Sequence, residues 1–262
     1  MKYIRVCRTD FSRWFATKKF FLAIAGIFTL HYLLLLQSVD ELETANIVYI
    51  VFMHMEDPFV IINFIFASAV FGTSYCEEKR KNYFSFYIKR CDKISYICSK
   101  ITHSFLSAFS VITIAMMLWI ISLRLIMPWA DFNSDMFWVC VDQGLGSLLE
   151  KHKFLTYYLI YSMGIGMLAG IISVITFVIS LFIKDQMVVH TLPAIIFYIY
   201  NVYIGDFSEH IYYWSLEHIF YFPKSQIPSV GLTFLRGALY ATLLSVMFGI
   251  IAYHKFRREL YE

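Results

Sequence analysis

The chain has few charged residues and few helix breakers. Charged side chains make up only 16% of its 262 residues, and it contains 5 prolines and 11 glycines. A net charge of +3 is too small for bulk electrostatic binding of nucleic acid, so no nucleic-acid partner is expected. The hydrophobic share is 59%, well above the roughly 45–50% of soluble domains. Lipid must solvate the excess, so the sequence predicts an all-α membrane protein.

Several chemical motifs are also missing. No G-x-x-x-x-G-K-[ST] loop is present, so the chain is not expected to hydrolyse ATP itself. No series of acidic residues or histidines within the apolar runs suggests a proton relay. The cysteines lack a familiar zinc spacing, and the four expected in the cytoplasm should be reduced thiols. We therefore assign no catalytic residue, no metal site, no disulfide framework and no cofactor to this chain.

Six apolar runs are long enough to cross a hydrocarbon layer of ~30 Å as helices. They cover approximately residues 20–38, 58–75, 104–127, 155–183, 186–204 and 231–253. The second and fifth runs are short and contain proline or polar residues, so a broken or re-entrant helix is an alternative there. The runs define a six-helix transmembrane domain over residues 20–253, followed by a cytoplasmic tail over residues 254–262.

Residues 1–19 are predicted to form an amphipathic helix that lies in the membrane interface. Basic residues run through this segment and no small-residue cleavage site follows it, so it is expected to remain in the mature protein. Helical spacing gathers the apolar side chains on one face, while the basic side chains lie mostly elsewhere. That apolar face contains Ile4, Cys7, Phe11, Trp14 and Phe15. A solvated basic leader is the alternative.

Basic residues gather on alternate connections between the runs. Residues 39–57 contain five acidic residues and no Lys or Arg, whereas the leader, residues 76–103 and the tail are rich in both. Because Lys and Arg mark cytoplasmic connections, both termini are expected in the cytoplasm. The expected location is the cell membrane of a bacterium, as a multi-pass protein.

The connection between the second and third runs is too long and too patterned for a simple turn. It reads CEEKRKNYFSFYIKRCDKISYICSKI and places an aromatic stretch between two basic clusters. A short helix with exposed aromatic side chains and flanking charge suits docking into a hydrophobic groove of another protein. A helix that lies on anionic headgroups fits the same pattern equally well.

The leader, the six runs and this connection together resemble the membrane subunit of an ABC-2-type (type V) ABC exporter. In that family an acidic residue, a turn, a short coupling helix and an aromatic-x-x-x-Lys entry lead into the third span. The turn here has Asn where the family often has Gly. The corresponding positions are Glu78, Lys81, Asn82, Tyr83, Phe84, Phe86, Tyr87, Arg90 and the stretch from Tyr96 to Lys100.

The resemblance implies a division of labour in which this chain is a non-enzymatic permease subunit. ABC ATPase subunits would bind ATP and Mg and contact the coupling segment, residues 77–100. A second copy or a related permease would complete a dimer, and residues 206–230 would form an outer re-entrant hairpin between the fifth and sixth spans. The expected cargo is an amphipathic substrate, such as an antimicrobial peptide or a lipid-like molecule, moved outward. The alternative is an ATPase-independent channel, secondary carrier or membrane scaffold.

Polar residues within the runs mark a candidate substrate path. It contains Asn63, Arg124, Asn201 and Arg236. An Arg at the bilayer centre costs roughly 2.5–3.5 kcal/mol, so extension of the two arginines to the interface is favoured over contact with substrate. His31 and His190 are expected to be neutral, hydrogen-bonded packing residues.

Small residues recur every four positions in the fourth run, at Ser162, Gly166 and Gly170. This spacing lets a neighbouring helix approach closely. It predicts either a contact within the chain, which is favoured, or a contact between two copies.

Overall fold

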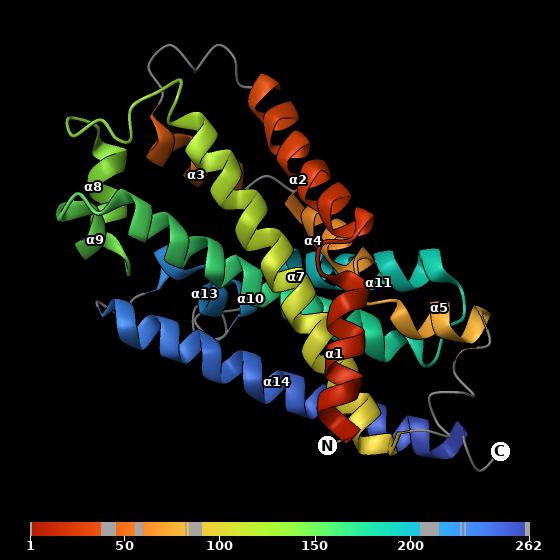
Figure 1. Cartoon of the computed structure of the whole chain (residues 1–262). Helices are drawn as coiled ribbons and strands as arrows, with labels where there is room; N and C mark the ends of the chain where they lie inside the picture. Colours follow the sequence, from red (N-terminus) through yellow and green to blue (C-terminus); the bar gives the residue numbers. More distant parts are fainter. Residues whose placement is uncertain are drawn as a thin grey trace.

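The computed structural model describes residues 2–37, 46–55, 60–81, 83, 91–204, 215–225, 227 and 229–259. Within these ranges all regular secondary structure is helical (Figure 1). Among the described residues, four helices are long and apolar enough to cross a membrane. The chain is therefore an all-helical, membrane-embedded protein, as its composition predicts.

The four spanning helices correspond to the first, third, fourth and sixth predicted spans. They are α2 (Lys18–Gln37), α7 (Lys93–Leu123), α10 (Phe154–Ser180) and α14 (Val230–Glu259). α7 begins at Lys93 rather than at residue 104, because the Asp92 carboxylate accepts hydrogen bonds from Ser95 N–H at 3.2 Å and Ser95 O–H at 2.9 Å. With 31 residues, α7 is about 46 Å long and extends beyond the ~30 Å hydrocarbon layer.

The second predicted span is a broken helix. α4 (Ile61–Ala69) ends at a turn over residues 70–73, and α5 (Ser74–Arg80) follows it. Because α4 has nine residues and is about 14 Å long, it cannot cross a bilayer alone. α3 (Ile47–Met55) lies within the acidic connection before it, yet Ile47 and Val51 are buried. The acidic residues on either side of α3 hid this apolar helix from the sequence prediction.

α11 (Gln186–Ile204) coincides with the fifth predicted span and contains Pro193 inside the helix. Its 19 residues measure about 28 Å, close to the thickness of the hydrocarbon layer.

Several of the shorter helices lie at two ends of the molecule (Figure 1). α1 (Lys2–Trp14), α5 and the start of α7 lie at one end, which we name the basal end. α8 (Asp135–Val141) and α9 (Gly146–Glu150) lie at the opposite, distal end. A small separate core joins α5, α7, α10 and α14 at the basal end. It contains Tyr75, Tyr96, Ile97, Phe177, Val178, Leu181, Ala252 and Phe256.

Two short helices, α13 (Leu216–Phe220) and the 3₁₀ helix η3 (Phe222–Lys224), occupy part of the predicted re-entrant hairpin. The Gly144 N–H, between α8 and α9, donates a hydrogen bond to Pro223 O at 3.2 Å. This bond connects η3 to the distal helices. Residues 205–214, 226 and 228 lie outside the described ranges, so the hairpin as a whole stays a prediction.

α1 lies within the predicted leader, residues 1–19, but it ends at Trp14, and residues 15–17 separate it from α2, which begins at Lys18. Its position in the membrane interface stays a prediction. Ile4, Phe11 and Phe15 are exposed, as a lipid-facing surface requires. Trp14 was assigned to the same face, yet it is buried and its Nε1–H donates to His103 Nδ1 at 3.1 Å. The prediction for Trp14 is wrong because this side of α1 packs against α7, and no local pattern in the leader encodes that contact.

The small-residue stripe of α10 packs against α7. A Cβ added at Gly166 would lie 2.6 Å from Thr113 Oγ1 and 3.0 Å from the Phe109 carbonyl oxygen. A Cβ at Gly170 would lie 2.6 Å from the Phe105 ring. The stripe therefore serves a contact within the chain, which was the favoured interpretation.

The substitution Gly166→Ala tests this packing. The added methyl group must displace backbone as well as side chain, so we expect a loss of about 1–3 kcal/mol in the free energy of unfolding. Thermal unfolding of the purified protein in detergent measures the effect. Gly231→Ala is the matched control, since nothing lies within 4 Å of a Cβ there. An equal midpoint for the two variants would contradict the close contact.

Candidate functional site

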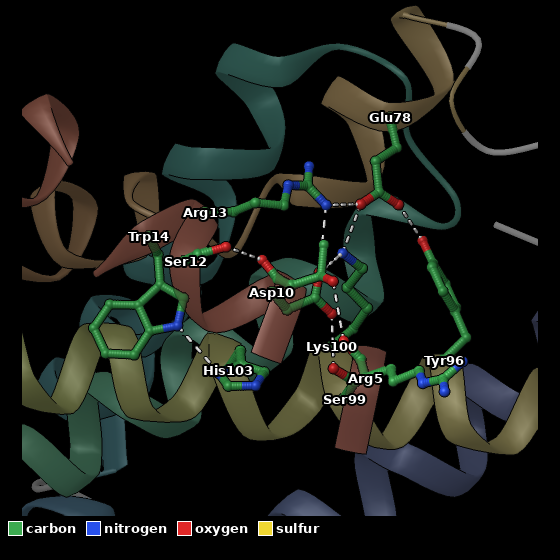
Figure 2. Close-up of polar contacts among 11 residues, drawn as sticks. Arg5, Asp10, Ser12, Arg13, Trp14, Glu78, Tyr96, Ser99, Lys100 and His103 are labelled. Carbon is green, nitrogen blue, oxygen red and sulfur yellow. Dashed lines mark hydrogen bonds and ion pairs between the residues drawn. The ribbon is translucent and has the colours of Figure 1, made fainter. Parts of the chain in front are cut away.

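Four charged side chains from three helices meet at the basal end, and Figure 2 shows how they converge. Asp10 and Arg13 come from α1, Glu78 comes from α5, and Lys100 comes from α7. We name this group the charge cluster. The side chains of Asp10, Glu78 and Lys100 are fully buried, and that of Arg13 is 31% exposed. Two acids and two bases make the cluster formally neutral.

Lys100 is the centre of the charge cluster. Its Nζ lies 2.8 Å from Asp10 Oδ1 and 2.6 Å from Glu78 Oε1. Arg13 forms an ion pair with Glu78, and its Nη1 lies 3.4 Å from Asp10 Oδ1. An unpaired charge buried at such a place costs several kcal/mol, so the burial of each member depends on the others.

Hydroxyl groups occupy the remaining acceptor positions of the two carboxylates. Tyr96 O–H donates to Glu78 Oε2 at 2.6 Å, and Ser99 O–H donates to Asp10 Oδ2 at 2.7 Å. Both oxygens of each carboxylate therefore have partners. Tyr96 and Lys100 are four residues apart on α7, so one side of that helix supplies both groups.

The charge cluster contains one residue from each end of the predicted coupling segment, residues 77–100. Glu78 lies at the start of the segment, where the Tyr83 N–H donates to the Glu78 carbonyl oxygen at 2.9 Å after α5 ends. Lys100 lies at the end of the segment, within the first turns of α7. The two ends are thus joined through a buried ion pair and held against α1.

The structure describes part of the predicted partner contact. Lys81 and Tyr83 are exposed, as residues that contact a partner must be. Glu78 is 1% exposed and its carboxylate faces the charge cluster, so it positions the segment rather than offering a surface. The other predicted contact residues lie outside the described ranges, and their role stays a prediction. They are Asn82, Phe84, Phe86, Tyr87 and Arg90.

A recess of about 520 Å³ opens beside α5, between that helix and the link from α10 to α11. Its lining includes Lys79, Arg80, Lys184 and Asp185, so three basic side chains face one acidic side chain. Cys76 also lines it, and burial raises the pKa of this thiol. The recess is therefore a basic concave surface next to the exposed start of the coupling segment.

The residues of the predicted substrate path lie on different elements. Arg124 follows the last residue of α7, and its Nη1 donates to the Met127 carbonyl oxygen at 3.1 Å. This position agrees with an arginine that reaches the interface. Asn201 of α11 and Arg236 of α14 are half-buried. A single path that includes these residues stays a prediction.

A second polar group is buried between α2, α4 and α7. The His31 ring stacks on the Trp119 ring with centroids 4.5 Å apart, and His31 Nε2 lies 3.2 Å from Asn63 Nδ2. Because an amide nitrogen is a donor, the histidine nitrogen accepts this hydrogen bond and the ring is neutral there. His31 is thus the packing residue that was predicted, and Asn63 is its partner.

Sequence reasoning missed Asp10 and gave Arg13 only a general basic role. Asp10 is the single acidic residue among residues 1–19, and it lies four residues before Trp14. That spacing places both residues on one side of a helix. A lone acid beside an aromatic residue in a basic helix was the available signal, but its partner could not be identified locally.

The substitution Lys100→Met tests the charge balance. It leaves the carboxylates of Asp10 and Glu78 buried with Arg13 as their remaining cation in the charge cluster, so we expect a loss of about 3–5 kcal/mol in stability. The double variant Lys100→Met/Asp10→Asn should recover part of this loss, because it restores neutrality. The thermal midpoint in detergent measures both effects.

The matched control for this prediction is Lys19→Met. Lys19 forms an ion pair with Glu77, but its side chain is 54% exposed. Exposed ion pairs contribute about 0–1 kcal/mol, so this variant should unfold close to the midpoint of the unmodified chain. A loss as large as that of Lys100→Met would show that burial of the charge cluster is not the cause.

The comparisons with known proteins assign no family to the chain. No family model matches it, and neither does any curated protein or solved structure. Its function must therefore be inferred from its own residues.

Proposed function

We propose that this chain is the permease subunit of an ATP-driven ABC exporter. It moves an amphipathic substrate outward, such as an antimicrobial peptide or a lipid-like molecule, with work supplied by a separate ATPase subunit. The observation that carries the proposal is the charge cluster, which joins both ends of segment 77–100 and fixes them to α1. Displacing a segment anchored in this way requires moving buried charges. The segment, residues 77–100, is therefore suited to transmit force from a partner, and we name it the handle.

The contacts around the handle support transmission of force to several helices. The Tyr96 and Phe256 rings stack with centroids 5.3 Å apart, which connects the handle to α14. Cys76 Sγ lies 3.7 Å from the Ile183 carbonyl oxygen, beyond the end of α10. A push on the segment would therefore reach α1, α7, α10 and α14 together.

The surface at the handle supports docking of another protein. Lys81 and Tyr83 are exposed, and the basic recess beside α5 lies next to them. In the proposed complex the ATPase subunit contacts this surface and residues 82–90. ATP and Mg bind to the ATPase, this chain binds no cofactor, and a second copy or a related permease completes the transporter.

The proposed topology has six spans with both termini in the cytoplasm of the bacterial cell. α3 and α4 together provide the broken second span, α5 begins the cytoplasmic connection, and α11 provides the fifth span. The basal end is cytoplasmic, because the leader, residues 76–103 and the tail carry most of the basic residues.

Truncation of the aromatic side chains of the handle tests the function. We expect Phe84→Ala/Tyr87→Ala, or Arg90→Glu, to abolish substrate-stimulated ATP hydrolysis while membrane insertion is unchanged. The complex would be purified from the native membrane, its ATPase identified by mass spectrometry, and hydrolysis measured in proteoliposomes. Phe132→Ala, at an exposed distal residue, is the matched control. Transport that continues in the handle variants, or without any ATPase, would favour the channel, carrier or scaffold.

Thiol labelling tests the orientation. A membrane-impermeant maleimide should not label the unmodified chain in intact cells, because Cys7, Cys76, Cys91 and Cys98 are then cytoplasmic. Cys140 is buried, and burial raises the pKa of its thiol to about 11, so little reactive thiolate forms.

The variant Asn133→Cys supplies the positive signal for this experiment. Asn133 is exposed near the distal end, so the introduced thiol should be labelled from outside intact cells. Labelling of the unmodified chain from outside, together with a silent Asn133→Cys, would place the basal end outside and refute the proposed orientation.

A further inference from the structure

A groove lies between α7 and α14, and its lining does not include the proposed ATPase contact at residues 82–90. It measures about 520 Å³, within the ~300–1,000 Å³ range of small-molecule sites, and opens on the outside of the helical bundle. Its walls are mostly apolar. Ile94 is 59% exposed and Ile250 is 56% exposed, so each wall presents a large apolar side chain.

The length of the groove along α14 matches the thickness of one leaflet of a bilayer. Along α14 it extends from Thr242 to Tyr253, about 16 Å, and along α7 from Ile94 to Thr102, about 12 Å. Half of a ~30 Å hydrocarbon layer is about 15 Å. The hydroxyl of Thr242 donates to the Ala238 carbonyl oxygen at 2.8 Å, so it does not require a polar ligand in the groove.

Helical spacing places two basic side chains at the basal mouth of the groove. Lys93 precedes the groove residue Ile97 by four positions, and Arg257 follows the groove residue Tyr253 by four positions, so each continues the groove face of its helix. Arg257 is exposed and Lys93 is half-buried. Among the described residues Asp92 is an adjacent acid, and its carboxylate caps α7 through Ser95.

We infer that this groove binds an anionic glycerophospholipid from the leaflet at the basal end. One acyl chain lies along the apolar walls, and Lys93 and Arg257 hold the phosphate group. Lipid surrounds all of a membrane-embedded chain. An apolar groove as long as one leaflet, with cations at its mouth, additionally selects lipids by the charge of their headgroups. This inference depends on the charge and shape of the groove and not on an ATPase partner.

Lipid retention by the purified full-length chain tests the inference. Native mass spectrometry would compare phosphatidylglycerol with phosphatidylcholine of the same acyl chains. Each basic residue near a membrane surface contributes about fivefold in affinity for anionic lipid, so Lys93→Gln/Arg257→Gln should retain phosphatidylglycerol roughly 25-fold less tightly. Retention of phosphatidylcholine should not change.

Two further variants, one with its own control, distinguish the effect of the basic side chains from the effect of the groove's shape. Lys151→Gln/Lys153→Gln removes two exposed distal lysines and should leave the retention of both lipids unchanged. Gly249→Leu should fill the groove and lower the retention of both lipids. It should fold, because an added Cβ would meet only the terminal Ile101 Cδ1, at 3.0 Å. Gly231→Leu, at an open position, is its matched control.

Three results would overturn the inference. The first is equal retention of the two lipids by the unmodified chain, and the second is unchanged selectivity in Lys93→Gln/Arg257→Gln. The third is efficient cross-linking of Cys98 between two copies by a short bismaleimide. Cys98 lines the groove and is exposed, so this cross-link would show that a second copy covers it.

Discussion

The burial of Lys100 is the constraint on which the basal end of the molecule depends. A fully buried ammonium group needs counter-charges, and it finds them in Asp10, 90 residues away in the sequence, and Glu78, 22 residues away. The leader helix is thus an integral part of the fold. Apolar replacements of buried ion clusters are often equally stable, so we interpret this cluster as a device that fixes the relative positions of three helices.

The sequence predicts the long spans well and the interrupted one poorly. α2, α10 and α14 contain apolar runs of spanning length, and such runs have few other stable environments. α3 escaped prediction because acidic residues on both sides made its short apolar run resemble a loop. The start of α7 was placed too late because Tyr96, Ser99 and Lys100 interrupt the apolar pattern, although they face a buried site.

The candidate site was predictable only where its members are close in sequence. Glu78 and Lys100 belong to one connection, whose resemblance to a known family marked them as related. Asp10 was not predictable, because no local pattern encodes a contact across 90 residues. The groove was also hidden from the sequence, since it forms only when the basal halves of α7 and α14 lie together.

The contact between α1 and α7 has a consequence for the assembly of the chain during synthesis. α1 leaves the ribosome before α7, so Asp10 is synthesised long before Lys100. Until then Asp10 must remain hydrated at the membrane surface, where Arg13 is its nearest cation within α1. When α7 enters the membrane, Lys100 forms ion pairs with Asp10 and Glu78, which were synthesised earlier. In a shortened chain that lacks α1, Lys100 would be inserted with Glu78 but without Asp10 as a counter-ion. The leader helix therefore stabilises a helix that is synthesised much later.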